Sequence, residues 1–148
     1  MPSTHVSLHY HLIFSTKDRV ASMREDLHER IHAYLGGVIR GLGGKALEVG
    51  GTADHVHLLV GLKATHTLSD VMRHLKGDSS RWLHEEVGLP LFSWQEGYGA
   101  FTVSRSDLER VGNYVRRQED HHRKRSFQDE YRELLLHHEI EFDEKYLW

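Results

Sequence analysis

The fold is decided around one stretch, Asp54-His55-Val56-His57-Leu58-Leu59-Val60, in which apolar residues surround two histidines. A short apolar run of this kind predicts a buried β-strand. Residues two apart on a strand project from the same face, with backbones roughly 6.5 to 7 Å apart. Both imidazoles can therefore reach one metal ion. The strand alone fits equally well a solvent-facing histidine pair that lies opposite an apolar core row.

A second motif follows much later, in Asn113-Tyr114-Val115-Arg116-Arg117-Gln118. Tyr114 and Gln118 are four residues apart, so they share one face of a predicted helix. At helical spacing from Leu108 and Val111, a tyrosine on its own is more often a core residue, and a lone glutamine is usually a surface residue. Together with the two histidines, however, the pair indicates a metal-assisted tyrosine nucleophile.

Hydrophobic periodicity predicts the remaining elements. Alternation with a period of two predicts a strand over about residues 6–14, and the histidine strand, which runs to about residue 62, forms a hairpin with a short strand near 45–49. Spacings of three and four predict helices over about 24–42, 67–87, 106–122 and 127–138. Two further short strands are expected at 91–94 and 100–103, as a hairpin or as one irregular strand.

This order of elements predicts the fold class. Strands that come early, in hairpins, with helices between them favour an α+β fold that is ferredoxin-like or RNA-recognition-motif-like. We expect a mainly antiparallel sheet of four to five strands with helices packed on one face. A chain of 148 residues without a linker or a repeat suits a single domain over residues 1–148.

Composition limits the chemistry and the location. The chain has no cysteine, which excludes disulfides, thiolate–zinc sites and cysteine nucleophiles. No apolar run approaches the roughly 18 to 20 residues of a membrane span, and the first five residues lack the basic and apolar parts of a signal peptide. We therefore expect a cytoplasmic protein with no membrane association.

Charge is unevenly distributed along the chain. The formal net charge is −3, which argues against a uniformly cationic nucleic-acid binder. Residues 110–125 are nevertheless basic and the following tail is acidic, so a local field can still attract a phosphate backbone. For any single residue, a solvated helix face is an equally good interpretation. The candidates for DNA contact are Arg116, Arg117, Arg123, Lys124 and Arg125.

The histidine spacing occurs a second time, at His9 and His11 in the first predicted strand. The alternation there places Tyr10 in the apolar row and both histidines on the opposite face. This pair is as well arranged for a metal ion as His55 and His57, so spacing does not choose between the two pairs.

Taken together, three segments resemble the small single-tyrosine HUH transposases of insertion sequences. They are the histidine strand, residues 92–101 with the sequence Phe-Ser-Trp-Gln-Glu-Gly-Tyr-Gly-Ala-Phe, and residues 113–122, which include the tyrosine motif. The likeness spans nearly the whole chain, including residues 140–148. A histidine–apolar–histidine pattern alone has low specificity, whereas three motifs in the family's order are highly specific.

The resemblance implies a single HUH transposase domain and a set of roles. It makes His55, His57 and Gln118 the ligands of a divalent metal, Mg²⁺ or Mn²⁺, and Tyr114 the nucleophile. It does not match His9 and His11. The implied reaction cleaves and rejoins single-stranded DNA at the hairpin ends of an insertion sequence through a 5′-phosphotyrosine, in a homodimer whose tyrosine helix can serve either subunit.

Other functions remain to be separated from this one. A catalytically silent nucleic-acid-binding domain derived from such a transposase would keep the sheet and the basic helix without the chemistry. A metal-dependent phosphodiesterase would use water, with Tyr114 only structural. Replication initiators and relaxases share the HUH site, but this chain has none of their additional helicase or primase segments.

Overall fold

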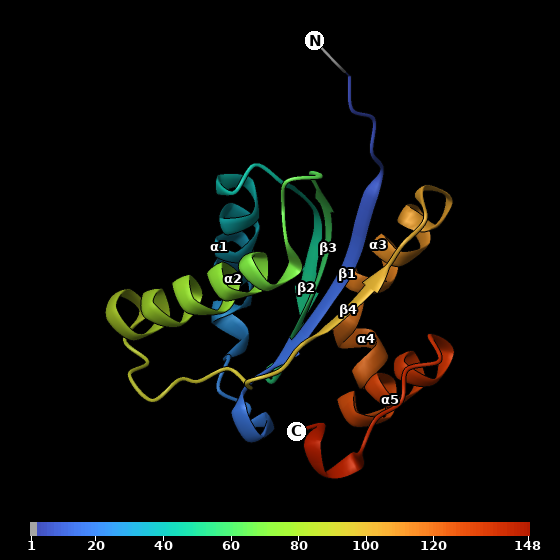
Figure 1. The fold of residues 1–148 in the computed structure, drawn as a ribbon. Coiled ribbons are helices and arrows are strands. Elements are labelled where there is room, and N and C mark those ends of the chain that lie inside the picture. The colour runs from blue at the N-terminus through green and yellow to red at the C-terminus, as the bar shows by residue number, and fades with distance from the viewer. Residues whose placement is uncertain (1–2) are drawn as a thin grey trace.

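Four antiparallel strands form one sheet, on which the helices pack (Figure 1). The structure is a computed structural model, which describes residues 3–148 of the chain. Their spatial order is β2-β3-β1-β4. The strands are β1 (Leu8–Ser15), β2 (Lys45–Gly51), β3 (His55–Leu62) and β4 (Gly99–Thr102). The two central strands, β1 and β3, are the most deeply buried. The predicted hairpin of β2 and β3 is confirmed, as is the α+β fold.

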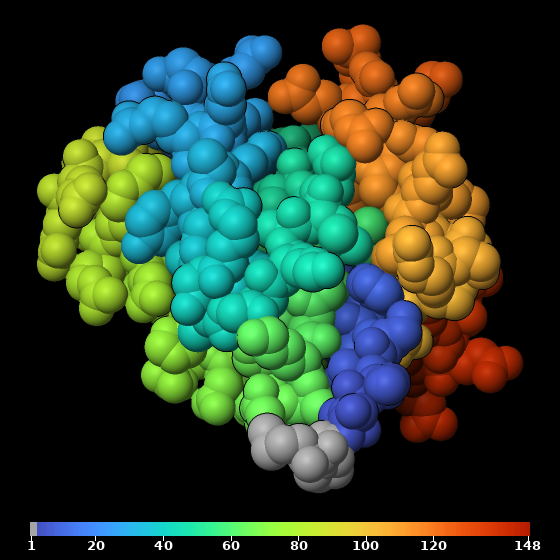
Figure 2. All heavy atoms as spheres, turned by 90° about the horizontal axis from the view of Figure 1, so that it is seen from above, coloured from blue at the N-terminus to red at the C-terminus, as the bar shows by residue number. Residues whose placement is uncertain are grey.

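Helices lie on both faces of the sheet (Figures 1 and 2). The longer elements are α1 (His28–Gly41), α2 (Leu68–Trp82), α3 (Leu108–Arg116), α4 (Gln118–His122) and α5 (Phe127–His137). Short turns of 3₁₀ or π geometry are Lys17–Arg19, Glu25–Leu27, Leu83–Val87, Arg105–Asp107 and Glu144–Tyr146. Helices α1 and α2 cover one face, and α3 to α5 cover the other.

The expectation that helices would cover only one face is wrong, because β1 and β3 carry buried apolar residues on both faces. Leu12 and Leu58 belong to the core under α1 and α2. Ile13 and Leu59, their chain neighbours on the opposite face, are equally buried. Successive strand residues alternate between faces, so both faces needed cover. The second, smaller core lies under α5 and includes Ile13, Phe101 and Phe127.

Three predicted elements differ in detail. Residues 91–94 form no strand, and only Thr16 and Trp94 make an isolated bridge there, so β4 pairs with β1 instead. The helix expected over 106–122 is broken at Arg117, where ψ is 29°, into α3 and α4. The helix expected over 67–87 ends as a π turn at Gly88, whose φ of 83° is left-handed. Its predicted start is confirmed, since the Thr67 hydroxyl accepts from the Asp70 backbone N–H.

Gly50 allows α3 to approach the sheet closely. A Cβ at this position would overlap the carbonyl oxygen of Val115. A glycine is therefore required where β2 passes under α3. This contact sets the distance between the sheet and α3, the helix that carries Tyr114.

Two expectations concern the chain as a whole. Within residues 3–148 no helix is long and apolar enough to cross a bilayer. The single domain over residues 1–148 stays a prediction. The expectation that the first five residues are not part of a signal peptide includes Met1 and Pro2, which lie outside the described residues.

Candidate functional site

Strand β3 places both of its histidines on the face covered by α3 to α5. The register pairs His57 with Ile13 and His55 with Ser15 of β1. Both imidazoles are 0% exposed, because α4 and α5 lie over this end of the sheet. A solvent-facing pair is therefore the wrong interpretation of this strand.

Gln118 lies against His55 even though the helix breaks before it. Its side-chain N–H donates to the carbonyl oxygen of Tyr114, at 3.2 Å, which bridges the break between α3 and α4. The amide oxygen is 3.1 Å from Nε2 of His55 and the same distance from Nε2 of His122. Gln118 thus turns its oxygen toward the imidazoles, as a metal ligand would.

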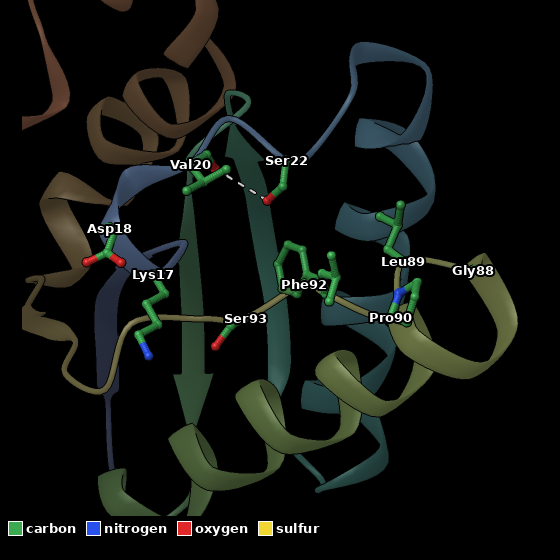
Figure 3. A pocket seen from close by; sticks show the side chains of 10 residues that line it. Lys17, Asp18, Val20, Ser22, Gly88, Leu89, Pro90, Phe92 and Ser93 are labelled. Atoms are coloured by element: carbon green, nitrogen blue, oxygen red, sulfur yellow. Dashed lines mark hydrogen bonds between the residues drawn. The ribbon is translucent and has the colours of Figure 1, made fainter.

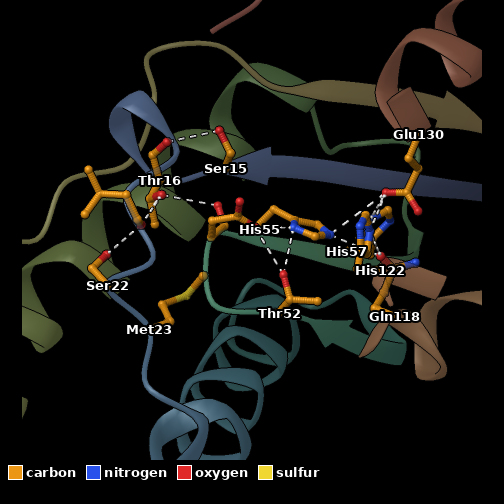
Figure 4. A network of polar contacts seen from close by, with 12 residues as sticks. Ser15, Thr16, Ser22, Met23, Thr52, His55, His57, Gln118, His122 and Glu130 are labelled. Atoms are coloured by element: carbon orange, nitrogen blue, oxygen red, sulfur yellow. Dashed lines mark hydrogen bonds and ion pairs between the residues drawn. The ribbon is translucent and has the colours of Figure 1, made fainter. Parts of the chain in front are cut away.

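Two further residues complete what we call the polar cluster, made of His55, His57, Gln118, His122 and Glu130 (Figure 4). Oε1 of Glu130 is 3.0 Å from Nε2 of His57 and 3.3 Å from Nε2 of His122. It is also 3.9 Å from Nε2 of His55. The carboxyl group is completely buried.

Sequence reasoning missed both additional residues. His122 follows Gln118 by four residues, so the helical spacing that connects Tyr114 to Gln118 could have found it. Glu130 gave no such signal, because it stands among many acidic residues of the tail. It reaches the cluster only because α5 folds back on the sheet, where Phe127 and Tyr131 pack beside Ile13.

Glu130 also connects the cluster to Tyr114. The Tyr114 hydroxyl donates a hydrogen bond to Oε2 of Glu130, while Oε1 faces the imidazoles. The rings of Tyr114 and His57 have their centroids 5.9 Å apart. The predicted nucleophile and the predicted metal ligands of one chain therefore lie together, on the two sides of a single carboxylate.

Both strand histidines are held at their Nδ1 atoms. Nδ1 of His55 is 2.7 Å from Asp54 Oδ1 and 3.0 Å from the Thr52 hydroxyl. Nδ1 of His57 is 2.7 Å from Nε2 of His11 on β1. With Nδ1 engaged, each ring turns its Nε2 toward the cluster, which is how second-shell partners usually orient histidine ligands.

Burial and hydrogen bonding determine the charges here. Burial lowers the pKa of His57 to about 4, although Glu130 acts in the opposite direction. Burial would raise the pKa of Glu130, but hydrogen bonds from His122, His57 and Tyr114 outweigh it and hold that pKa well below its ordinary value. At neutral pH, His57 is therefore neutral and Glu130 is a carboxylate.

Tyr114 is a protonated phenol in this arrangement. Burial raises its pKa, and the negative charge of Glu130 raises it further. A phenolate forms here only after something lowers that pKa, and a cation at the cluster would have this effect.

The donor set fits a divalent cation. Ligand atoms of His55, His57, His122 and Glu130 all lie within 4.8 Å of one another. Imidazole nitrogens and carboxyl or amide oxygens suit Mn²⁺ and other transition metals, and the oxygens suit Mg²⁺. The single negative charge of Glu130 leaves half of a divalent ion's charge uncompensated.

The basic residues named from the sequence differ in whether they already form an ion pair with an acidic side chain. Arg116 pairs with Glu48 at 3.1 Å, and Arg125 pairs with Glu133. Arg123 pairs with Asp120 at 3.5 Å, with both side chains exposed. Within residues 3–148, Arg117 and Lys124 form no ion pair, and both are exposed.

Two cavities lie on different sides of the sheet. One, of about 560 Å³, opens between the loop after β1 and the segment after α2, is lined mainly by apolar side chains such as Leu89 and Phe92, and contains no residue of the polar cluster (Figure 3). The other, of about 380 Å³, opens beside Tyr114 and is lined also by His11, Phe101 and Arg110. The second cavity gives a ligand access to the phenol.

Comparisons with known proteins point in one direction. A family model described as IS200-like transposase matches residues 4–118. The transposases for insertion sequence element IS200 of Salmonella typhimurium and Salmonella typhi are each 27% identical over 115 residues, which cover 74% of this chain and 75% of the relative.

Solved structures give the same picture. A protein of Deinococcus radiodurans R1, provisionally described as a transposase, superposes with a TM-score of 0.64 and 25% identity, over 78% of this chain and 93% of its own. A REP-associated tyrosine transposase bound to a REP hairpin superposes with a TM-score of 0.57 over 78% of this chain and 68% of its own. At 13% identity, the second likeness shows the fold alone.

Proposed function

Because this chain belongs to the IS200-like transposase family, we propose that it cleaves and rejoins single-stranded DNA through a covalent bond between Tyr114 and a 5′-phosphate. His55, His57 and Gln118 hold a divalent ion for this reaction. One observation carries the proposal: Glu130 accepts the Tyr114 hydroxyl on one oxygen and faces Nε2 of His57 on the other. Nucleophile and ion site are thereby adjacent.

The reaction requires a balanced exchange of bonds. The Tyr114 oxygen attacks phosphorus, an O–P bond forms, and the bond from phosphorus to the 3′-oxygen breaks. The phenol releases its proton to solvent, and the departing 3′-oxygen takes one up from solvent. The phosphotyrosine stores the energy of the broken bond, so the reverse attack by a 3′-hydroxyl rejoins strands without a nucleotide cofactor.

The chain's own residues prepare this step. The hydrogen bond to Glu130 fixes the direction of the phenol, and the hydrogen bond from Gln118 to the Tyr114 carbonyl ties α4 to α3. A bound divalent ion would neutralise charge on the phosphate and lower the pKa of the phenol. His122 and Glu130 are additional candidates to contact that ion, since their ligand atoms face the same point.

We propose single-stranded DNA with hairpin ends as the substrate. The fold is shared with a tyrosine transposase that is bound to a REP hairpin, and Arg117 and Lys124 offer cations close to the cluster. We also propose a homodimer, which the resemblance implies, and a cytoplasmic location. The tyrosine beside the cluster here is the chain's own, so in this arrangement a second subunit need not supply the nucleophile.

A covalent adduct tests the proposal. The protein is incubated with a single-stranded hairpin oligonucleotide and Mn²⁺, and denaturing electrophoresis with mass spectrometry locates any DNA linked to a peptide. We expect an adduct on Tyr114 that disappears in Tyr114→Phe. The control is Tyr34→Phe, on the other face of the sheet, where the hydroxyl donates only to the Asp78 carbonyl.

The alternatives give different products. DNA binding without an adduct in any divalent metal would indicate a binding domain. Cleavage that survives Tyr114→Phe would indicate hydrolysis by water. Either result overturns the proposal.

A further inference from the structure

His11 is a buried histidine that the proposed ion site does not include, although its spacing from His9 repeats that of His55 and His57. His11 lies on β1 and is 4% exposed. Its Nε2 is 2.7 Å from Nδ1 of His57, and the two rings stack with centroids 5.0 Å apart. The register explains this contact, because His57 is opposite Ile13 and His11 is the next residue of β1 on the same face.

The opposite nitrogen of His57 fixes the direction of this hydrogen bond. Nε2 of His57 is 3.0 Å from Oε1 of Glu130, and a carboxylate oxygen only accepts hydrogen bonds. Nε2 must therefore carry the proton. A neutral imidazole has one N–H, so Nδ1 of His57 accepts, and Nε2 of His11 donates to it.

Binding an ion through Nε2 reverses this arrangement. The coordinating nitrogen of a neutral histidine carries no proton, so the proton is on the other nitrogen. Nδ1 of His57 must then donate, and Nε2 of His11 must accept. Protons balance if each ring moves its own proton from Nε2 to Nδ1, since both rings stay neutral in both states.

His55 offers a useful contrast. Its Nδ1 faces the Asp54 carboxylate at 2.7 Å, which only accepts, so this Nδ1 donates whether or not an ion is bound. The hydrogen-bond partner of His57 Nδ1, in contrast, has to donate when no ion is bound and accept when an ion is bound. An imidazole can play either role. A carboxylate only accepts, an ammonium group only donates, and an apolar side chain does neither.

We propose that His11 is a positioning residue that lets His57 exchange tautomers as the divalent ion binds, while it keeps the His57 ring directed at the cluster. The proposal rests on the ion site of the proposed function. His11 holds Nδ1 of His57 by a hydrogen bond, as Asp54 holds Nδ1 of His55. Unlike Asp54, His11 can be either the donor or the acceptor of that bond.

Three variants separate this role from simple packing. His11→Phe keeps an aromatic ring to stack on His57 but has no hydrogen bond. His11→Gln keeps a side chain whose amide can donate or accept. His9→Phe is the matched control, because His9 lies on the same face of β1 but touches no residue of the polar cluster through a hydrogen bond, and its Nδ1 has no partner within the described residues.

The first measurement is calorimetric titration of each full-length protein with Mn²⁺. Loss of a second-shell partner typically weakens metal binding 10- to 100-fold. We expect a loss of that size in His11→Phe, a change of less than about threefold in His11→Gln, and none in His9→Phe. Equal affinity in wild type and His11→Phe would overturn the proposal while leaving the ion site intact.

The second measurement needs no catalysis. ¹⁵N chemical shifts of the His57 ring report which nitrogen carries the proton, with Zn²⁺ as the diamagnetic ion. We expect an Nε2–H tautomer in the metal-free protein and Nδ1–H with Zn²⁺ bound. The same tautomer in both states would overturn the exchange, even if His11→Phe failed to fold. Failure of the wild-type protein to bind any divalent ion would instead overturn the proposed function, and this inference with it.

Discussion

At the scale of single residues, Glu130 joins the two halves of the site, because one of its oxygens accepts a hydrogen bond from Tyr114 and the other faces His57 and His122. Tyr114 and Gln118 share a helical spacing, and His55 and His57 share a strand face, so local geometry was enough to single them out. Their roles as nucleophile and ligands stay predictions. Glu130 could not be found in this way, because only tertiary packing brings α5 against the site. His11 was found only as a member of the second histidine pair, since its contact with His57 depends on the pairing of β1 with β3.

Glu130 gives the prediction that belongs to this scale. Glu130→Ala leaves the buried donors of His57 and Tyr114 without their acceptor, and it removes one of the two acceptors beside Nε2 of His122. We expect the free energy of unfolding to fall by about 2 to 4 kcal/mol and Mn²⁺ binding to weaken. Urea denaturation, followed by circular dichroism in the presence of a chelator, measures the first effect separately from the second.

The control lies one turn further along the same helix. Glu133 is exposed and pairs with Arg125, so Glu133→Ala should cost less than about 1 kcal/mol. Equal losses in the two variants would contradict the central place given to Glu130.

At the scale of elements, periodicity predicted strands and helices better than breaks. The hairpin of β2 and β3 and the cap at Thr67 are confirmed. The strand expected at 91–94 is wrong, because β4 finds its partner in β1 rather than in its chain neighbour. The break at Arg117 could not be read from periodicity, since the four-residue spacing of Tyr114, Gln118 and His122 continues through it.

Two glycines make a matched test of how elements pack. Gly50→Ala places a Cβ against the Val115 carbonyl, which forces α3 away from β2. We expect a loss of about 1 to 3 kcal/mol in the free energy of unfolding and less adduct on Tyr114, since α3 carries the nucleophile. Chemical denaturation and the adduct assay measure the two effects.

Gly77 is the counterpart, in the middle of α2. It is exposed, and a Cβ there would meet no atom within 4 Å, so the close contact that a mid-helix glycine can indicate is absent at this position. Gly77→Ala should add about 0.5 to 1 kcal/mol and leave the adduct unchanged. A stabilised Gly50→Ala, or a destabilised Gly77→Ala, would contradict the packing described here.

At the scale of the whole molecule, the net charge of −3 conceals a basic region next to the site. Its place was predictable from the sequence, but the pairing of Arg116 with Glu48 and of Arg125 with Glu133 was not, because these partners are brought together by folding. Arg117 and Lys124 are left as the better candidates for phosphate contact.

Salt dependence tests this assignment. Each phosphate contact with single-stranded DNA contributes about 0.7 to the slope of log affinity against log salt. The double variant Arg117→Ala, Lys124→Ala should bind the hairpin oligonucleotide more weakly and lower that slope by about 1.4, as measured by fluorescence anisotropy. The double variant Arg40→Ala, Lys45→Ala removes as much charge elsewhere, and an equal effect from it would show that only total charge matters.

The most direct test of the account is a crystal structure of the protein grown with Mn²⁺, in which anomalous scattering locates the ion. We expect one strong peak bound by Nε2 of His55 and of His57 and by the Gln118 oxygen, with a Tyr114 hydroxyl turned toward it. A peak held by other residues, or no peak at the cluster under saturating Mn²⁺, would contradict it.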